Sequence, residues 1–139
     1  MKFLKKKKIK SCFIKKNYKN QIDEQNLLNN NGKLFCEKNR EIALNKAIYE
    51  NYEVAIFDDG IQDYSINYDI NLICFNRRNL IGNGMTIPSG PLRQDLSILK
   101  KYNHIFLNGG KGDYSELENK VLEINPNITI HKGTYVPTN

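Results

Sequence analysis

The chain has 139 residues, of which 40% are hydrophobic, and carries a formal net charge of +6. This length is enough for one domain with a substantial core, and no window approaches the roughly 18 apolar residues that a membrane-spanning helix needs. Residues 1–20 contain nine lysines and no acid, so the remaining 12 basic and 15 acidic residues carry a net charge of −3. The basic charge therefore belongs to one end of the chain.

The lysine-rich segment 1–20 is predicted to lead into the first strand, and residues 21–139 to form the main domain. The segment lacks the apolar stretch of a secretory signal. Its charge suits contact with anionic lipid or nucleic acid, or simple exposure to solvent, and we favour solvent exposure. No recognised nucleic-acid-binding motif accompanies the lysines, so we expect no nucleic-acid partner.

Strand and helix patterns alternate through the first half of the chain. Apolar residues at 9–14 indicate a short strand, and Asp23 and Glu24 open a helical pattern because acids in a first turn suit the helix dipole. A second short strand covers residues 34–36, and Asn39 is expected to cap the next helix. The apolar face of that helix consists of Ile42, Ala43, Ala47 and Ile48.

The apolar run that begins at Val54 ends in two adjacent acids, Asp58 and Asp59, followed by Gly60. Such a run predicts a strand over 53–58 that is buried on both faces, as in a parallel sheet. Ligands collect at the carboxyl ends of such strands. The two acids therefore indicate either a Mg²⁺ site for phosphoryl transfer or an ordinary Asp-Asp-Gly turn, and the local pattern alone favours neither.

The second half continues the alternation after an irregular section. A buried strand is predicted over 69–75, and residues 76–93 hold too much glycine and proline for a helix or strand. A connection of that length is usually functional or disordered. A short helix near 96–99, a strand over 104–108, a helix over 115–124 and a last strand over 128–130 follow. This order predicts an α/β domain with a mainly parallel sheet.

Several common catalytic and metal-binding motifs are absent from the sequence. There is no Walker A spacing, and Asn-Gly-Gly-Lys-Gly at 108–112 is interpreted as a plain turn. The three cysteines Cys12, Cys36 and Cys74 do not fit a zinc spacing and are expected to be buried reduced thiols. His104 and His131, on the flanks of different strands, are expected to be structural or exposed.

Four segments in order resemble the signature of the tetraacyldisaccharide 4′-kinases. They are Asp58-Asp59-Gly60-Ile61-Gln62, Asp69, Gly82-Asn83-Gly84 and Ile87-Pro88-Ser89-Gly90-Pro91-Leu92-Arg93. The resemblance implies a P-loop NTPase-like, three-layer α/β fold with a mainly parallel sheet. It also implies an enzyme, a phosphotransferase with an alcohol acceptor. Such an enzyme uses ATP and Mg²⁺ to phosphorylate the 4′-hydroxyl of the lipid A disaccharide-1-phosphate precursor.

The resemblance also implies roles for particular residues. Asp58 and Asp59 correspond to the acidic pair that holds Mg²⁺ and orders the phosphates of ATP, and Gln62 closes that motif. Asp23 corresponds to the base on the sugar hydroxyl, although Ile22 replaces the glycine of the family. The loop that approaches the disaccharide corresponds to Gly82, Asn83, Gly84, Gly90 and Arg93. In that loop, Arg93 is the candidate phosphate contact.

The chain also departs from the family pattern. Asp63 stands where the family often has histidine, and Ser89 replaces an alanine. The phosphate-binding loop of the family is expected before residue 1 and its C-terminal histidine beyond residue 139, which leaves the fold incomplete on its N-terminal side. We therefore expect a kinase fragment that is inactive by itself and lies peripherally on the cytoplasmic face of the inner membrane.

Two explanations of such a fragment stay open. In the first, the chain comes from an incomplete gene, a split gene or a shortened gene prediction, and another chain is one source of the missing kinase segments. Alternatively, the chain is a catalytically inactive remnant or a non-catalytic α/β binding domain, because a kinase without a phosphate loop cannot position ATP.

Overall fold

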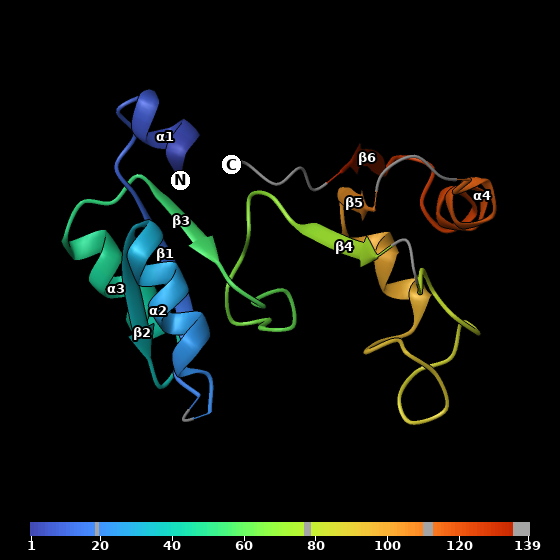
Figure 1. Cartoon of the computed structure of the whole chain (residues 1–139), viewed down its shortest axis with the longest axis horizontal. Helices are drawn as coiled ribbons and strands as arrows, with labels where there is room; N and C mark the ends of the chain where they lie inside the picture. Colours follow the sequence, from blue (N-terminus) through green and yellow to red (C-terminus); the bar gives the residue numbers. More distant parts are fainter. Residues whose placement is uncertain (19, 77–78, 110–112, 135–139) are drawn as a thin grey trace. The chain divides into compact units, whose positions relative to one another are not determined.

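The computed structural model describes residues 1–18, 20–76, 79–109 and 113–134 (Figure 1). The chain forms two compact units, residues 1–67 and 68–139. Each unit contains a three-stranded parallel sheet, in the order β2-β1-β3 in the first and β4-β5-β6 in the second. The α/β class with parallel strands that the sequence predicts is confirmed.

The elements of the first unit follow the predicted alternation of strand and helix. They are α1 (Lys2–Lys6), β1 (Ser11–Lys16), α2 (Ile22–Asn31), β2 (Lys33–Glu37), α3 (Arg40–Tyr49) and β3 (Val54–Phe57). Asn39 caps α3 as predicted, because its side chain accepts a hydrogen bond from the backbone N–H of Ile42 at 2.9 Å.

The two longer helices of this unit cover opposite faces of its sheet. Cys12 and Ile14 of β1 are fully buried and pack with Ala43 and Ala47 of α3. Successive side chains of a strand point to opposite faces, so Lys15 lies on the other face, where it contacts α2. The sheet is therefore apolar toward α3 and carries a charged group toward α2.

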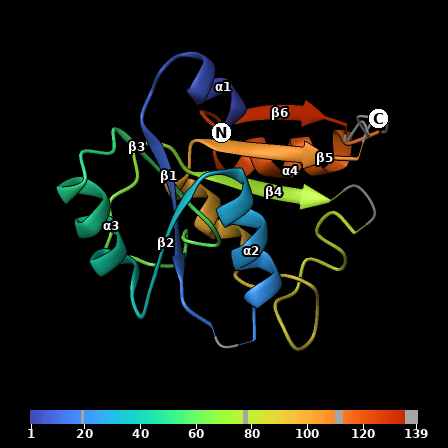
Figure 2. The same cartoon turned by 60° about the vertical axis from the view of Figure 1, so that its left-hand side comes forward.

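The elements of the second unit surround a larger apolar core. They are β4 (Leu72–Asn76), the 3₁₀ helix η1 (Leu96–Lys101), β5 (His104–Asn108), α4 (Ser115–Ile124) and β6 (Thr129–Gly133). The three strands run in one direction (Figure 2). Ile105 and Leu107 of β5 are fully buried in one cluster with Leu117 and Val121 of α4 and Leu99 of η1. The amide of Asn125 donates to the carbonyls of Leu99 and Tyr102, both at 2.9 Å, and so fastens the end of α4 to η1.

Several local predictions are wrong. The first strand lies at Ser11–Lys16, two residues later than predicted, and the last at Thr129–Gly133. β3 is half-buried throughout because it is an edge strand of the described sheet, so its apolar run is not covered on both sides. Ile48, which is predicted to lie on the apolar face of α3, is 60% exposed. The buried residues of α3 are Arg40, Ala43 and Ala47.

Predictions for individual charged and polar residues are confirmed only in part. The lysines of α1 are exposed, as the expectation of a solvated start requires, but Lys15 is 2% exposed and departs from it. Of the three free cysteines, Cys12 is buried, Cys36 is half-buried and Cys74 is exposed. His131 is exposed and His104 is half-buried, in line with the expectation for them, and their ring nitrogens Nε2 and Nδ1 lie 3.2 Å apart across β6 and β5. The predicted glycine turn at 110–112 lies outside the described residues.

Candidate active site

The two acids predicted as a metal site lie at the carboxyl end of β3. The backbone N–H of Asp58 donates to the carbonyl of Ile14 at 3.0 Å, which extends the ladder between β1 and β3 by one residue. Asp58 and Lys15 are consequently neighbours on adjacent strands, on the α2 face of the sheet. The Asp58 side chain is 40% exposed and Asp59 is exposed. Both carboxylates are accessible from solvent.

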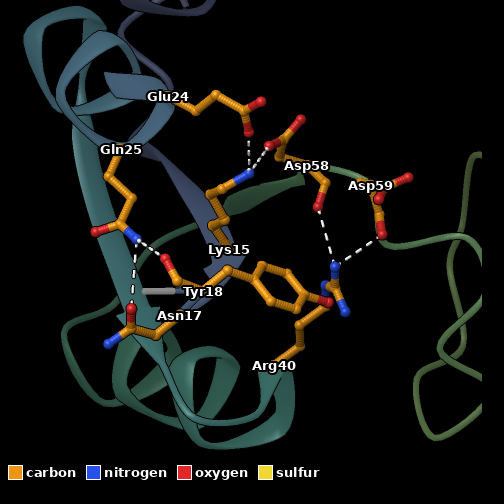
Figure 3. A network of polar contacts seen from close by, with 8 residues as sticks. All are labelled: Lys15, Asn17, Tyr18, Glu24, Gln25, Arg40, Asp58 and Asp59. Carbon is orange, nitrogen blue, oxygen red and sulfur yellow. Dashed lines mark hydrogen bonds and ion pairs between the residues drawn. The ribbon is translucent and has the colours of Figure 1, made fainter. Parts of the chain in front are cut away.

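Lys15 fills the space between Asp58 and the first turn of α2. Its Nζ atom lies 2.5 Å from Oδ2 of Asp58 and 2.7 Å from Oε2 of Glu24, and its side chain is only 3% exposed (Figure 3). Burial by itself lowers the pKa of Lys15, but hydrogen bonds to Asp58 and Glu24 and their negative charges outweigh that effect. The net result is a pKa above the ordinary lysine value. Lys15 is therefore a charged ammonium group held between two carboxylates.

Arg40 holds the acidic pair through the backbone carbonyl groups of the two residues. Its Nη2 atom donates to the carbonyl of Asp59 at 2.7 Å and to that of Asp58 at 3.3 Å (Figure 3). The Arg40 side chain is 6% exposed. Asp59 has a φ of +50°, a left-handed conformation that non-glycine residues seldom adopt. The guanidinium group fixes the turn at the residue where the backbone is least favourable.

A third acid, Asp63, completes the surroundings of Arg40. Its Oδ2 atom lies 3.7 Å from Nη1 of Arg40. The hydroxyl of Ser65 donates to Asp63 at 2.6 Å. This bond, the Ser65 backbone N–H and Arg40 together hold the pKa of Asp63 below its ordinary value, against the opposing effect of burial. Asp63 is thus an ionised carboxylate that anchors Arg40, at the position where the resemblance has histidine.

The first turn of α2 is fastened to the end of β1 at two points. Glu24 reaches Lys15, and the side-chain amide of Gln25 donates to Oδ1 of Asn17 at 3.3 Å and to the carbonyl of Tyr18 at 3.4 Å. Asp23, the residue before Glu24, is exposed. Its turn is therefore fixed beside the strand end, while its own carboxylate is left to solvent.

Gln62 lies in the turn that follows the acidic pair. The backbone N–H of Asp63 donates to the carbonyl of Gly60 at 2.9 Å, which closes this turn, and Gly60 is buried. The Gln62 side chain is exposed. The structure places Gln62 four residues after Asp58 on a closed turn, and its predicted role stays a prediction.

The predicted disaccharide loop belongs to the second unit, and Asn83 organises it internally. The Asn83 amide nitrogen donates to the carbonyl of Ser89 at 2.8 Å, and its Oδ1 atom accepts from the backbone N–H of Met85 at 3.1 Å. The backbone N–H of Ile87 donates to the carbonyl of Leu92 at 2.8 Å. These bonds join the two arms of the loop, so the Gly-Asn-Gly and Pro-Ser-Gly-Pro-Leu-Arg segments form one structure.

The glycines of this loop permit its close packing. Gly82 and Gly84 have φ values of +56° and +75°, and a Cβ on Gly82 would lie 2.6 Å from Cγ of Pro91. A Cβ on Gly90 would overlap Oδ1 of Asn83 and the carbonyl oxygen of Met85. Arg93 is exposed at the end of this arrangement. The glycines are therefore required by the shape of the loop, whatever it binds.

Two of the residues that hold the acidic pair were not predicted from the sequence. Lys15 was counted among the solvated lysines, although it continues the apolar run Cys12-Phe13-Ile14 inside the strand. Arg40 begins α3, where a positive charge opposes the helix dipole and calls for a specific anionic or carbonyl partner. A charged residue in an unfavourable local position was the available signal in both cases.

The oxygen atoms at the end of β3 suit a magnesium ion that is shared with phosphates. Magnesium usually binds one or two carboxylates together with waters and substrate phosphate oxygens. Asp58 and Asp59 provide two carboxylates, and in the described part of the chain no group of three His, Cys, Asp or Glu side chains is arranged to hold a metal. Two carboxylates at one strand end are a ligand set that Mg²⁺ accepts when water or phosphate oxygens complete its coordination.

Comparison with known proteins identifies similar sequences over nearly the whole chain. A family model described as tetraacyldisaccharide-1-P 4′-kinase matches residues 6–137. The tetraacyldisaccharide 4′-kinase of Pelagibacter ubique is 53% identical over 136 residues, which are 98% of this chain and 43% of that protein. The enzyme of the same name from Haemophilus influenzae is 30% identical over 105 residues, 75% of this chain and 31% of that protein.

Other relatives with the same name match shorter stretches. One from Shewanella halifaxensis is 38% identical over 66 residues, 48% of this chain and 20% of that protein. The chain therefore spans less than half the length of these curated relatives. No solved structure matches it.

Replacement of Arg40 by lysine tests the support of the acidic pair. Lysine keeps the charge but lacks the planar group that reaches both carbonyls, so we expect Arg40→Lys to lower the free energy of unfolding by about 2 kcal/mol. The measurement is urea unfolding followed by circular dichroism. Asn45→Gln, at an exposed position of the same helix, is the control and should change stability by less than about 0.5 kcal/mol. Equal stability of both variants would contradict this role of Arg40.

Replacement of Gly90 by alanine tests the internal packing of the loop. The new Cβ would displace Asn83, so we expect the backbone amides of Met85, Ile87 and Leu92 to lose their protection from hydrogen exchange. Gly84→Ala is the control: its φ of +75° makes an alanine strained there, but only Nζ of Lys120 lies near its Cβ, at 3.7 Å. That variant should cost about 1 kcal/mol and keep the protection. Protected amides in Gly90→Ala would show that the loop does not depend on this contact.

Proposed function

The chain belongs to the tetraacyldisaccharide 4′-kinase family, and we propose that it forms the acidic half of the active site of such a kinase. In this proposal the complete protein transfers the γ-phosphoryl group of ATP to the 4′-hydroxyl of the lipid A disaccharide-1-phosphate precursor. The observation that carries the proposal is the acidic pair at the carboxyl end of β3, held by Lys15 and Arg40.

Phosphoryl transfer depends mainly on positioning and on neutralising charge. Asp58 and Asp59 would hold Mg²⁺, which when bound neutralises phosphate charge and orients the β- and γ-phosphates. Arg40 keeps both carboxylates in place through their backbone carbonyls. Gln62, on the turn after the pair, is proposed to contribute to the nucleotide side of the site.

Asp23 is the proposed base for the 4′-hydroxyl. A carboxylate acts in this role if it lies within hydrogen-bond reach of the hydroxyl in the substrate complex. The position of Asp23 supports the proposal indirectly, because the adjacent Glu24 ties this turn to Lys15, the contact of Asp58. Exposure leaves the Asp23 carboxylate accessible to a substrate.

The loop that contains Gly82, Asn83, Gly84, Gly90 and Arg93 is proposed to contact the disaccharide. Its internal hydrogen bonds support a preformed surface rather than a flexible segment. The exposed Arg93 at its end has a planar group that suits the 1-phosphate of the precursor. Asn83 would act on this surface by holding the loop arms together.

The proposed location is the cytoplasmic face of the bacterial inner membrane. Short α1 carries lysines together with Phe3, which is 67% exposed, a combination suited to an anionic lipid surface. Each lysine near such a surface contributes roughly 1 kcal/mol. None of the helices in the described ranges is both long and apolar enough to cross a membrane.

A non-catalytic α/β domain is the second candidate, and one observation favours it. The 139 residues contain no Gly-x-x-x-x-Gly-Lys-Ser/Thr sequence to bind the phosphates of ATP. In the kinase proposal these groups come from other segments of the complete enzyme, on the same polypeptide or on another chain. The two candidates therefore differ in whether this segment supports turnover when the remaining parts are supplied.

A chimera distinguishes the two candidates. The matching segment of the Pelagibacter ubique relative is replaced by this chain, and transfer of radioactive phosphate from ATP to the tetraacyldisaccharide 1-phosphate is measured. We expect the chimera to be active and Asp59→Asn to lower its rate at least about 100-fold, because phosphate positioning is lost. The isolated chain should show no turnover.

Two controls make this experiment decisive. Glu41→Gln, an exposed acid on α3, should leave the rate of the chimera within about twofold. Circular dichroism and thermal unfolding establish that each protein is folded. A folded chimera without activity would favour the non-catalytic domain, and an active Asp59→Asn chimera would remove Asp59 from the proposed metal site.

A further inference from the structure

Lys15 holds the acidic pair in the proposed kinase site, but that proposal gives its positive charge no part in ligand binding. Its ammonium group contacts Asp58 at 2.5 Å and Glu24 at 2.7 Å, from a side chain that is 3% exposed. An isolated charge is costly to bury, so an ammonium at this depth depends on its two carboxylates. Conversely, Asp58 has a cation beside it before any metal arrives.

The titratable groups around Lys15 come from three elements. Asp58 follows β3, Glu24 lies in α2, and the register of the sheet places Cys36 of β2 opposite Lys15 on its other side. Arg40 contacts the backbone of Asp58, not its carboxylate. In the described part of the chain, Lys15 is therefore the identified partner of the Asp58 carboxylate.

A divalent cation at Asp58 would meet this ammonium group directly. Both cations require the same carboxylate, and two positive charges within a few ångströms of each other repel. If Asp58 takes part in metal binding, the two cations share its negative charge, so its contact with Lys15 through Oδ2 weakens. Glu24 remains as the second partner of Lys15, so the lysine keeps an anion while it gives up Asp58.

We propose that Lys15 is a resident cation of the acidic site, which occupies Asp58 in the absence of metal and competes with a divalent cation for it. This proposal rests on the proposed metal-binding role of Asp58 and Asp59. Lys15 is a positioning residue: without metal it neutralises Asp58 and keeps the first turn of α2 at the end of β3. Metal binding at the pair is then an exchange of one cation for another.

The competition predicts that removing the lysine charge strengthens metal binding while it weakens the metal-free fold. In Lys15→Met, Asp58 has no competing ammonium and Glu24 becomes available as a further oxygen ligand. We expect this variant of the full chain to bind Mn²⁺ at least about tenfold more tightly than the wild type. Its melting temperature without metal should fall, because two carboxylates have lost their shared partner.

The measurement is free Mn²⁺ by electron paramagnetic resonance during titration of the 139-residue chain. Lys15→Gln is a second neutral variant in case Lys15→Met does not fold, and the same tightening is expected. Lys15→Arg retains the charge, so its affinity should stay within about threefold of the wild type. Lys46→Met removes the same charge from another ion pair, with Glu37 at 2.5 Å, and should leave the affinity unchanged.

The outcomes separate this proposal from the proposed function. Tighter Mn²⁺ binding by the neutral Lys15 variants, but not by Lys46→Met, supports the resident cation. If the wild type binds Mn²⁺ through Asp59 and the Lys15 variants bind equally or more weakly, Lys15 is only structural and the metal site stands. If neither the wild type nor the Lys15 variants bind Mn²⁺, both the resident cation and the proposed metal site are overturned.

Discussion

The buried ammonium of Lys15 connects three elements of the first unit that are separate in sequence. Because the charge lies inside the sheet layer, it must have carboxylates beside it, and these come from the end of β3 and the first turn of α2. Arg40 imposes a similar requirement on the opposite side, since its guanidinium needs the carbonyls of Asp58 and Asp59. The two cations together define where the acidic pair lies and which way the following turn runs.

These contacts place charged groups at the carboxyl ends of β1 and β3, beside the apolar core of the first unit. Cys12 and Ile14 of β1 pack against α3, whereas the next residue of the same strand, Lys15, is charged. Because successive side chains of a strand point to opposite faces, β1 directs Ile14 into the apolar core and Lys15 toward the acidic pair. The candidate site needs this separation, because its acids must stay accessible while β1, the strand beside the one that carries them, is packed firmly.

Elements whose structure depends on a local pattern of residues lie where the sequence predicts them. The helix at Ser115–Ile124, the strand at His104–Asn108 and the Asn39 cap lie where periodicity and capping chemistry predict them. Features that depend on residues far apart in the sequence were not predicted. Lys15 looked solvated because Glu24 and Asp58 are not its sequence neighbours, and β3 looked like a central strand because strand order does not follow from an apolar run. The motif at 82–93 was recognised, but its internal hydrogen bonds through Asn83 were not.

The acidic pair after β3 must bind a divalent cation if it is to serve phosphoryl transfer as proposed. The most direct measurement is a titration of the ¹⁵N-labelled chain with Mg²⁺, followed by two-dimensional NMR of the backbone amides. The account predicts saturable shifts centred on Asp58, Asp59 and Gly60, which extend through Lys15 to Glu24. Shifts centred on other acids, such as Glu116 and Glu118 of α4, or no saturable shifts at all, would contradict it.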